Sequence, residues 1–190
     1  MSDIWLVTGG GRSGKSAYAE SVAAGVRLPR NDVVLYIATG VALDSEMEER
    51  IAIHRKNRPN NWITWERYRG FKDIENDFKA NSFGTIILDC ISNLLMGVLF
   101  EEIPDPEGFS SKEFEQVEQL AISEVETLCK YAIKYDKRLI FVTNEVGMGI
   151  IPETRYSRYY RDALGRINKF AAEAADKVVL MIAGIPVVIK

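Results

Sequence analysis

Eight residues near the N-terminus have the types and spacing needed to hold a polyphosphate: Gly9-Gly10-Gly11-Arg12-Ser13-Gly14-Lys15-Ser16. They fit the pattern G-x-x-x-x-G-K-[ST]. The glycines let the backbone turn tightly and bring its N–H groups close to phosphate oxygens. Lys15 would reach the β- and γ-phosphates of a nucleotide, and Ser16 would hold Mg²⁺. The competing interpretation is a glycine-rich turn that binds nothing.

The elements on either side of these glycines favour a phosphate site. Residues 4–8 (Ile-Trp-Leu-Val-Thr) form a short apolar run typical of a buried strand, and residues 17–24 have the composition of a helix. The N-terminus of that helix would add unpaired N–H donors and the positive end of its dipole. The motif depends on this strand–loop–helix context, and the chain supplies it.

Polar residues also follow two other predicted strands. Residues 32–38 are rich in β-branched and aromatic side chains and precede Thr39-Gly40. Residues 85–89 form an apolar strand that ends in Asp89, a pattern that resembles the Walker B element, whose carboxylate lies beside Mg²⁺. The alternative is that Asp89 merely caps the next turn. Ligands bind at the carboxyl ends of parallel strands, which favours the magnesium interpretation.

The single histidine, His54, lies in a segment with several basic side chains. Residues 45–58 are predicted to be a helix that opens with a Ser45–Glu48 capping box and ends near Pro59. Helical spacing is compatible with a His54 that faces the core and makes one hydrogen bond. The neighbouring Arg50, Arg55, Lys56 and Arg58 instead favour a nucleophile or acid–base group at a phosphate site.

Two further sets of polar residues leave their roles open. Glu145 follows the predicted strand 137–143 and could orient water, a metal or a substrate hydroxyl, or could be a loop carboxylate in an ordinary hydrogen bond. Arg158 and Arg161, in the helical region 153–176, could grip phosphates or pair with acids at a subunit contact.

The order of the predicted elements gives the fold class. Further strands are predicted at residues 61–66, 177–183 and 187–190, and helices at residues 71–79, 93–100 and 111–135, with a loop at 101–108. Strands that alternate with helices indicate one α/β domain over residues 1–190, with a mostly parallel sheet covered by helices on both faces. Residues 184–186 (Gly-Ile-Pro) would separate the last two strands in a terminal β-hairpin. The acidic outer face of helix 111–135 is interpreted as solvated.

Composition narrows the class of ligand. The chain has 190 residues, 47% of them hydrophobic and 27% charged, with a net charge of −3. This charge gives no support to nucleic-acid or anionic-membrane binding. We expect no membrane span and no secretion leader. Cys90 and Cys129 are not in a metal-ligand spacing, so reduced, buried thiols in a cytoplasmic protein are expected.

Taken together, these residues resemble the bifunctional adenosylcobinamide kinase / adenosylcobinamide-phosphate guanylyltransferase family of cobalamin biosynthesis. The most specific matching pieces are His54-Arg55-x-x-Arg58-Pro59 and Thr143-Asn144-Glu145-Val146-Gly147-Met148-Gly149. The phosphate loop, Tyr36-Ile37-Ala38-Thr39, Leu88-Asp89-Cys90, Arg161-Asp162-x-x-Gly165-x-x-Asn168 and Gly184-Ile185-Pro186 also match. Gly11 is commonly alanine in the family, and residues 101–111 carry no pattern of it.

The resemblance implies a RecA-like P-loop NTPase fold and two reactions. A nucleoside triphosphate, GTP or ATP, would phosphorylate the aminopropanol hydroxyl of adenosylcobinamide, and GMP from GTP would then pass through a guanylylated histidine, matching His54, to the new phosphate. Lys15 and Asp89 would assist catalysis, with Ser16 and Asp89 beside Mg²⁺. The nucleotide site would comprise Gly9, Gly10, Gly11, Arg12, Ser13, Gly14, Lys15, Ser16, Ala38, Thr39, Gly40, Arg55, Lys56, Asn57, Arg58, Glu66 and Asp89. The family also implies a homo-oligomer, with a trimer favoured.

Other functions remain as alternatives. A monofunctional P-loop small-molecule kinase would use Lys15, Ser16 and Asp89 in the same way but leave His54 unmodified. A GTP-dependent switch is disfavoured because the chain has no Asn-Lys-x-Asp guanine-specifying motif. A RecA-like ATPase acting on DNA is disfavoured by the acidic net charge.

Overall fold

A seven-stranded sheet forms the centre of the computed structural model, which describes residues 3–25, 33–40, 59–79, 82–105 and 107–190. The strand order is β3-β2-β4-β5-β1-β6-β7. All neighbouring strands are parallel except β6 and β7, which pair antiparallel. The strands are β1 (Asp3–Gly9), β2 (Val34–Ala38), β3 (Ile63–Glu66), β4 (Thr85–Asp89), β5 (Arg138–Val142), β6 (Lys177–Ile182) and β7 (Ile185–Val188).

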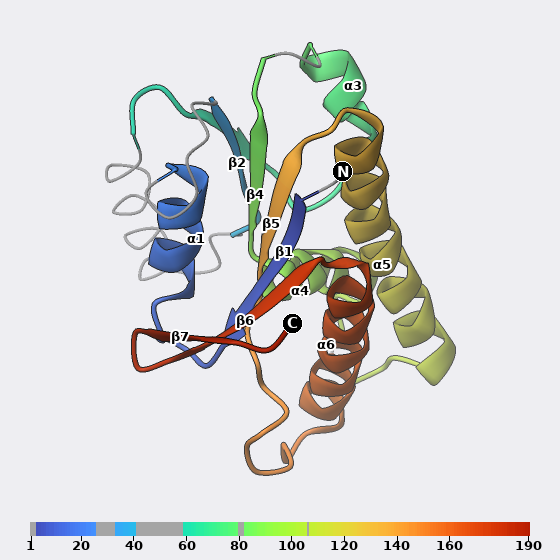
Figure 1. The fold of residues 1–190 in the computed structure, drawn as a ribbon. Coiled ribbons are helices and arrows are strands. Elements are labelled where there is room, and N and C mark those ends of the chain that lie inside the picture. The colour runs from blue at the N-terminus through green and yellow to red at the C-terminus, as the bar shows by residue number, and fades with distance from the viewer. Residues whose placement is uncertain (1–2, 26–32, 41–58, 80–81, 106) are drawn as a thin grey trace.

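Helices cover both faces of this sheet (Figure 1). Helix α1 (Lys15–Ala23) lies on one face, where it shares an apolar cluster with strand residues such as Val7 and Ile140. Helices α4 (Ile91–Glu102), α5 (Ser111–Lys134) and α6 (Arg155–Ala174) pack on the other face in a larger cluster. The short helices η1 (Phe71–Asp73) and α3 (Ile74–Asp77) follow β3. The α/β class and the helix-covered parallel sheet predicted from the sequence are thus confirmed.

Strand register aligns the predicted ligand residues at one edge of the sheet. Ala38 lies opposite both Glu66 and Asp89, and Asp89 lies opposite Val142. Val142 in turn lies opposite Val7, two residues before the end of β1. Because all these strands are parallel, their carboxyl ends and the loops that follow them lie along one edge.

Element boundaries differ from the sequence prediction at α4 and at the terminal hairpin, among other places. Helix α4 extends to Glu102, beyond the predicted end, because Leu99 and Ile103 are buried and the Ile103 N–H bonds the Leu99 carbonyl at 2.9 Å. The terminal hairpin is confirmed, but its turn is Ala183-Gly184, with φ of 50° and 84°. Two consecutive positive φ values suit a two-residue hairpin turn. Pro186 therefore lies inside β7, an edge strand, where a missing N–H is tolerated.

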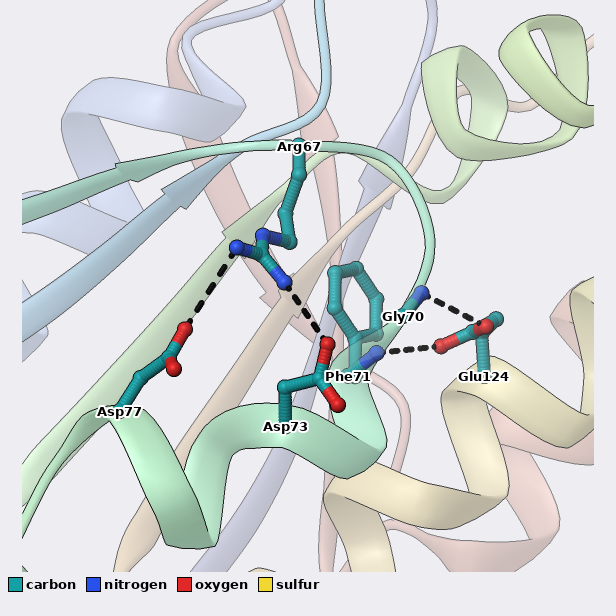
Figure 2. A network of polar contacts seen from close by, with 6 residues as sticks. All are labelled: Arg67, Gly70, Phe71, Asp73, Asp77 and Glu124. Atoms are coloured by element: carbon teal, nitrogen blue, oxygen red, sulfur yellow. Dashed lines mark hydrogen bonds and ion pairs between the residues drawn. The ribbon is translucent and has the colours of Figure 1, made fainter.

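The acidic face of α5 is not merely solvated, contrary to the sequence interpretation. Figure 2 shows the Glu124 carboxylate accepting hydrogen bonds from the Gly70 and Phe71 N–H groups, both at 2.8 Å. These donors lie at the start of η1, where N–H groups are unpaired and an anion is favoured. Glu118, buried on α5, accepts two hydrogen bonds from Arg166 of α6 at 2.7 and 2.6 Å.

The segment after β3 is held by ion pairs as well. In Figure 2 the Arg67 guanidinium lies between Asp73 and Asp77, at 3.3 and 3.5 Å. The guanidinium also stacks on the Trp65 ring, 3.9 Å from its centroid. Glu66 lies between Trp65 and Arg67 in the chain, so this network fixes the backbone at a predicted nucleotide contact.

Two remaining expectations concern membranes and cysteines. Among the helices that the structure describes, none combines the length and the apolar character that a membrane crossing needs. Cys90 and Cys129 are both buried free thiols, as predicted.

Candidate active site

The loop between β1 and α1 is built around glycines at two positions. Gly9 has φ of 148°, and a Cβ there would lie 2.5 Å from the Met181 carbonyl oxygen. Gly14, at the N-cap of α1, has φ of 92°. Among the described residues, and apart from the adjoining chain, no atom lies within 4 Å of where a Cβ would stand on Gly10 or Gly11. The backbone therefore requires glycine at the two ends of the loop, whereas the described structure leaves room for a Cβ at Gly10 and Gly11.

Backbone hydrogen bonds hold this loop from two sides. The Glu145 N–H, in the loop after β5, donates to the Gly9 carbonyl at 3.0 Å. The Gly184 N–H, in the hairpin turn, donates to the Ser13 carbonyl at 3.1 Å. The β5 loop and the β6–β7 hairpin thus fix the shape of the phosphate loop, a role that the sequence analysis did not assign to them.

Lys15 lies within the loop rather than in solvent. Its side chain is 8% exposed, and Nζ donates to the Gly10 carbonyl at 2.6 Å. Burial lowers the pKa of Lys15, and the electrostatic influence of Cys90 and Asp89 opposes that shift. An ammonium group that is partly stripped of water interacts more strongly with an incoming anion.

Asp89 is oriented by a tyrosine from the neighbouring strand. The Tyr36 hydroxyl donates to Asp89 Oδ2 at 2.6 Å, and the buried Tyr36 ring stacks on Trp62 with centroids 6.1 Å apart. In the described part of the chain no hydrogen bond to Asp89 Oδ1 is found. The tyrosine and Asp89 are 53 residues apart, so only the pairing of β2 with β4 brings them together.

The side-chain oxygens of Ser16 and Asp89 suit a Mg²⁺ ion that takes most of its other ligands from a bound nucleotide. Ser16 offers one hydroxyl at the start of α1, and Asp89 offers one carboxylate. The residues that the structure describes contain no cluster of three or more His, Cys, Asp or Glu that could hold a metal alone. Mg²⁺ in phosphate-loop sites takes few protein ligands and completes its octahedron with phosphates and water.

Removing the Tyr36 hydroxyl tests whether it orients Asp89 for a metal. Tyr36→Phe keeps the stacked ring, so we expect nucleotide affinity in the presence of Mg²⁺ to fall about tenfold, the loss of one hydrogen bond to a charged group. Calorimetric titration with and without Mg²⁺ measures this. An equal loss in EDTA would show that the hydroxyl acts on the nucleotide pocket in general and not on the metal.

Behind Asp89 lies a polar network that the sequence analysis missed in part. Thr39 Oγ1 accepts from the Cys90 N–H at 2.6 Å and donates to the Cys90 carbonyl at 2.7 Å. Cys90 Sγ lies 2.9 Å from Ser92 Oγ, which also accepts from the Asn144 amide. Burial raises the pKa of Cys90 to about 11, so the thiol is protonated at neutral pH and is no nucleophile.

The structure brings some of the predicted site residues together and leaves others undescribed. Gly9–Ser16, Ala38–Gly40, Asp89 and Glu145 all lie at the carboxyl edge of the sheet, with Glu66 two strands from Asp89. His54, Arg55, Lys56, Asn57 and Arg58 lie outside the described residues, as does the predicted helix 45–58.

Arg158 and Arg161 of α6 bind neighbouring groups of the same segment. Arg158 Nη1 donates to the Pro152 and Glu153 carbonyls at 3.0 and 2.6 Å, which anchors the start of the helix. Arg161 pairs with the adjacent Asp162 at 2.8 Å. Arg158 thus helps to order the end of the β5–α6 connection. The Arg161–Asp162 pair lies within α6.

Similarity to known proteins bears on the function of the carboxyl edge of the sheet. The profile of the family described as cobinamide kinase / cobinamide phosphate guanyltransferase matches residues 5–189. The chain belongs to this family.

Relatives match over nearly their full length. The bifunctional adenosylcobalamin biosynthesis protein CobU of Escherichia coli is 39% identical over 186 residues, 97% of this chain and 98% of the relative. CobU of Salmonella typhimurium is 40% identical, with the same coverage. CobP of Pseudomonas aeruginosa, also named a bifunctional adenosylcobalamin biosynthesis protein, is 34% identical over 97% of this chain and 96% of the relative.

A solved structure supports the fold. The KaiC-like protein of Pyrococcus horikoshii superposes with a TM-score of 0.51 at 14% identity, covering 94% of this chain and 70% of that chain. At that identity the likeness concerns the fold alone. The RecA-like P-loop fold that the sequence resemblance implied is thereby confirmed.

Proposed function

We propose that this protein phosphorylates adenosylcobinamide with a nucleoside triphosphate and then transfers GMP from GTP to the new phosphate, giving adenosylcobinamide-GDP. The observation that carries the proposal is the family match over residues 5–189, which includes the phosphate loop, Asp89 and His54. The names of the relatives, bifunctional proteins of adenosylcobalamin biosynthesis, agree with two activities on one chain.

The kinase reaction would use the edge between β1 and β4. Backbone N–H groups of residues 9–16 would bind the phosphates, and Lys15 would stabilise charge on the β- and γ-phosphate oxygens. Ser16 and Asp89 would hold Mg²⁺, which neutralises charge on the leaving diphosphate when bound. Ala38, Thr39, Gly40 and Glu66, along the same edge, would contact the rest of the nucleotide.

The guanylyl transfer would proceed through His54. A neutral imidazole is a good nucleophile near pH 7, and it becomes a fair leaving group once protonated. Attack on the α-phosphate of GTP would release pyrophosphate, and the acceptor phosphate would then displace the imidazole. Arg50, Arg55 and Arg58 would stabilise the charge that develops on the equatorial oxygens, with Lys56 and Asn57 lining the same nucleotide.

The family resemblance also supports a proposal for the domain organisation, oligomeric state, location and substrates of this protein. We propose a single catalytic domain over residues 1–190 that assembles as a homotrimer in the cytoplasm. Its substrates would be small molecules, GTP or ATP and the corrinoid, with no nucleic acid among them.

Intact-protein mass spectrometry after incubation with GTP and Mg²⁺ tests the histidine intermediate. The wild type should gain the mass of one GMP, because the phosphoramidate bond to His54 survives neutral pH. His54→Ala should gain none while still binding GTP. Brief acid treatment should remove the adduct from the wild type, since protonation makes the imidazole leave.

A wild type that binds GTP and forms no adduct would overturn the guanylyltransferase half of the proposal. The monofunctional kinase would then be the leading function, because it needs Lys15, Ser16 and Asp89 but no modified histidine. Phosphorylation of adenosylcobinamide by the His54→Ala variant provides the matched check on folding.

A further inference from the structure

We propose that Glu145 is the general base of the kinase reaction, accepting the proton of the acceptor hydroxyl as it attacks the γ-phosphate. The inference rests on the proposed function and assigns a residue whose role the sequence left open. It also separates the two reactions, because only one of them needs such a base.

The sheet topology places Glu145 between the two halves of the phosphate site. Strand β5 lies directly between β4, which ends in Asp89, and β1, which leads into the phosphate loop. Val142, the last residue of β5, is in register with Asp89 on one side and Val7 on the other. The loop after β5, which contains Glu145 three residues beyond Val142, therefore leaves the sheet between the triphosphate-binding backbone and the predicted metal ligand.

The backbone at Glu145 is tied to the phosphate loop and to the core behind it. The Glu145 N–H donates to the Gly9 carbonyl at 3.0 Å. The preceding residue, Asn144, is fixed twice: its carbonyl accepts from the Asn168 amide at 3.1 Å, and its own amide donates to Ser92 Oγ at 2.9 Å. These contacts leave the loop little freedom next to Gly9, as a base needs.

The Glu145 carboxylate is held by a backbone N–H of its own loop. Its Oε1 accepts from the Gly147 N–H at 2.5 Å, a turn that orients the side chain. Over the ranges of the chain that the structure describes, no lysine or arginine forms an ion pair with Glu145. The side chain is half-buried at the edge of the loop, so a proton taken from a substrate can pass on to water.

The residues after Glu145 suit a large organic acceptor. Met148 and Ile150 are 82% and 95% exposed, and Val146 and Ile151 are exposed as well. Apolar side chains exposed this far on one short loop mark a surface that another molecule covers. The corrin macrocycle of the acceptor would provide that cover while its aminopropanol arm reaches the γ-phosphate.

The two acceptors differ in whether the attacking oxygen must lose a proton. In the kinase reaction the hydroxyl oxygen bonds to the γ-phosphorus, the bond from that phosphorus to the bridging oxygen breaks, and the electron pair leaves with the nucleoside diphosphate. The hydroxyl proton passes to Glu145 and then to water. In guanylyl transfer the acceptor is a phosphate that is already ionised at neutral pH, so no base is required.

The test is Glu145→Gln, assayed separately in each reaction. Glutamine keeps the acceptor for the Gly147 N–H but does not take up a proton. Phosphorylation of adenosylcobinamide should fall about 100-fold in kcat, in the range typical of losing a general base. Transfer of GMP to adenosylcobinamide phosphate supplied as substrate should stay within twofold of the wild type. Glu145→Asp should restore part of the rate.

Control measurements distinguish a general base at position 145 from a residue with only a structural role. Glu173→Gln removes the same charge from the exposed face of α6 and should change neither reaction. Equal losses in both reactions, weaker nucleotide binding in step with the kinase loss, or no loss at all would each overturn the role of Glu145. A wild type inactive in both reactions would overturn the proposed function, and the role of Glu145 with it.

Discussion

Replacing Lys15 by methionine is expected to lower the rate of phosphoryl transfer by about 1000-fold, since a single well-placed donor or cation at a developing phosphate charge contributes on this scale. Methionine matches the length of the lysine stem and carries no charge. The Lys15 ammonium already lies inside the phosphate loop, 2.6 Å from the Gly10 carbonyl oxygen. Steady-state kinetics with saturating nucleotide measure the loss.

The same substitution should leave the nucleotide-free protein at least as stable as the wild type. Burial lowers the folded-state pKa of Lys15 below its ordinary value of 10.5, so the folded state binds this proton less tightly than the unfolded state does. The charged lysine therefore disfavours folding at every pH below the folded-state pKa, and this penalty vanishes only above 10.5. At pH 7 the methionine variant escapes it, and thermal unfolding without nucleotide should show an equal or higher Tm.

Opposite signs for activity and stability are what distinguish a functional lysine from a structural one. Lys130→Met, on the exposed surface of α5, provides the matched control and should change neither quantity. A Lys15→Met variant that is both inactive and markedly less stable would show that the lysine holds the loop together, which contradicts the role given to it here.

The sequence alone predicts the parts of the site that depend on a local pattern of residue types. The phosphate loop, the strand ending in Asp89 and the polar residues after β5 all follow from residue types read in order. The Tyr36 hydrogen bond to Asp89 and the Glu145 N–H bond to Gly9 do not, because each joins segments that only the strand order makes neighbours. A tyrosine within an otherwise apolar strand was the available signal for the first contact.

Element boundaries and the roles of surface charges also depend on tertiary contacts that the local sequence does not reveal. The turn at Ala183-Gly184 and the end of α4 were misplaced because Pro186, and Pro104 with Pro106, were given more weight than tertiary packing. Glu124 could not be distinguished from the solvated acids of α5, since its partners are backbone N–H groups more than fifty residues away. These two hydrogen bonds position the segment that follows Glu66, a predicted nucleotide contact.

Gly9→Ala is expected to lower the free energy of unfolding by about 3 kcal/mol, the scale of combined backbone strain and overpacking. The added Cβ would lie 2.5 Å from the Met181 carbonyl oxygen and 2.8 Å from Ser13 Oγ, and φ of 148° is strained for alanine. Met181 belongs to β6, which pairs with β1 at this position, so the carbonyl has no room to retreat. For a chain of this size the loss corresponds to a Tm lower by roughly 6–12 °C.

Gly11→Ala is the matched control, because no described residue outside the adjoining chain has an atom within 4 Å of its added Cβ. We expect its stability to stay within about 0.5 kcal/mol of the wild type, as at other unconstrained positions. Calorimetry on both variants without nucleotide isolates the strain from any effect on phosphate binding. If the two variants unfold at the same temperature, β6 does not constrain the start of the phosphate loop. The contact between β1 and β6 would then set only the strand pairing, and the glycine at position 9 would owe its place to the bound nucleotide.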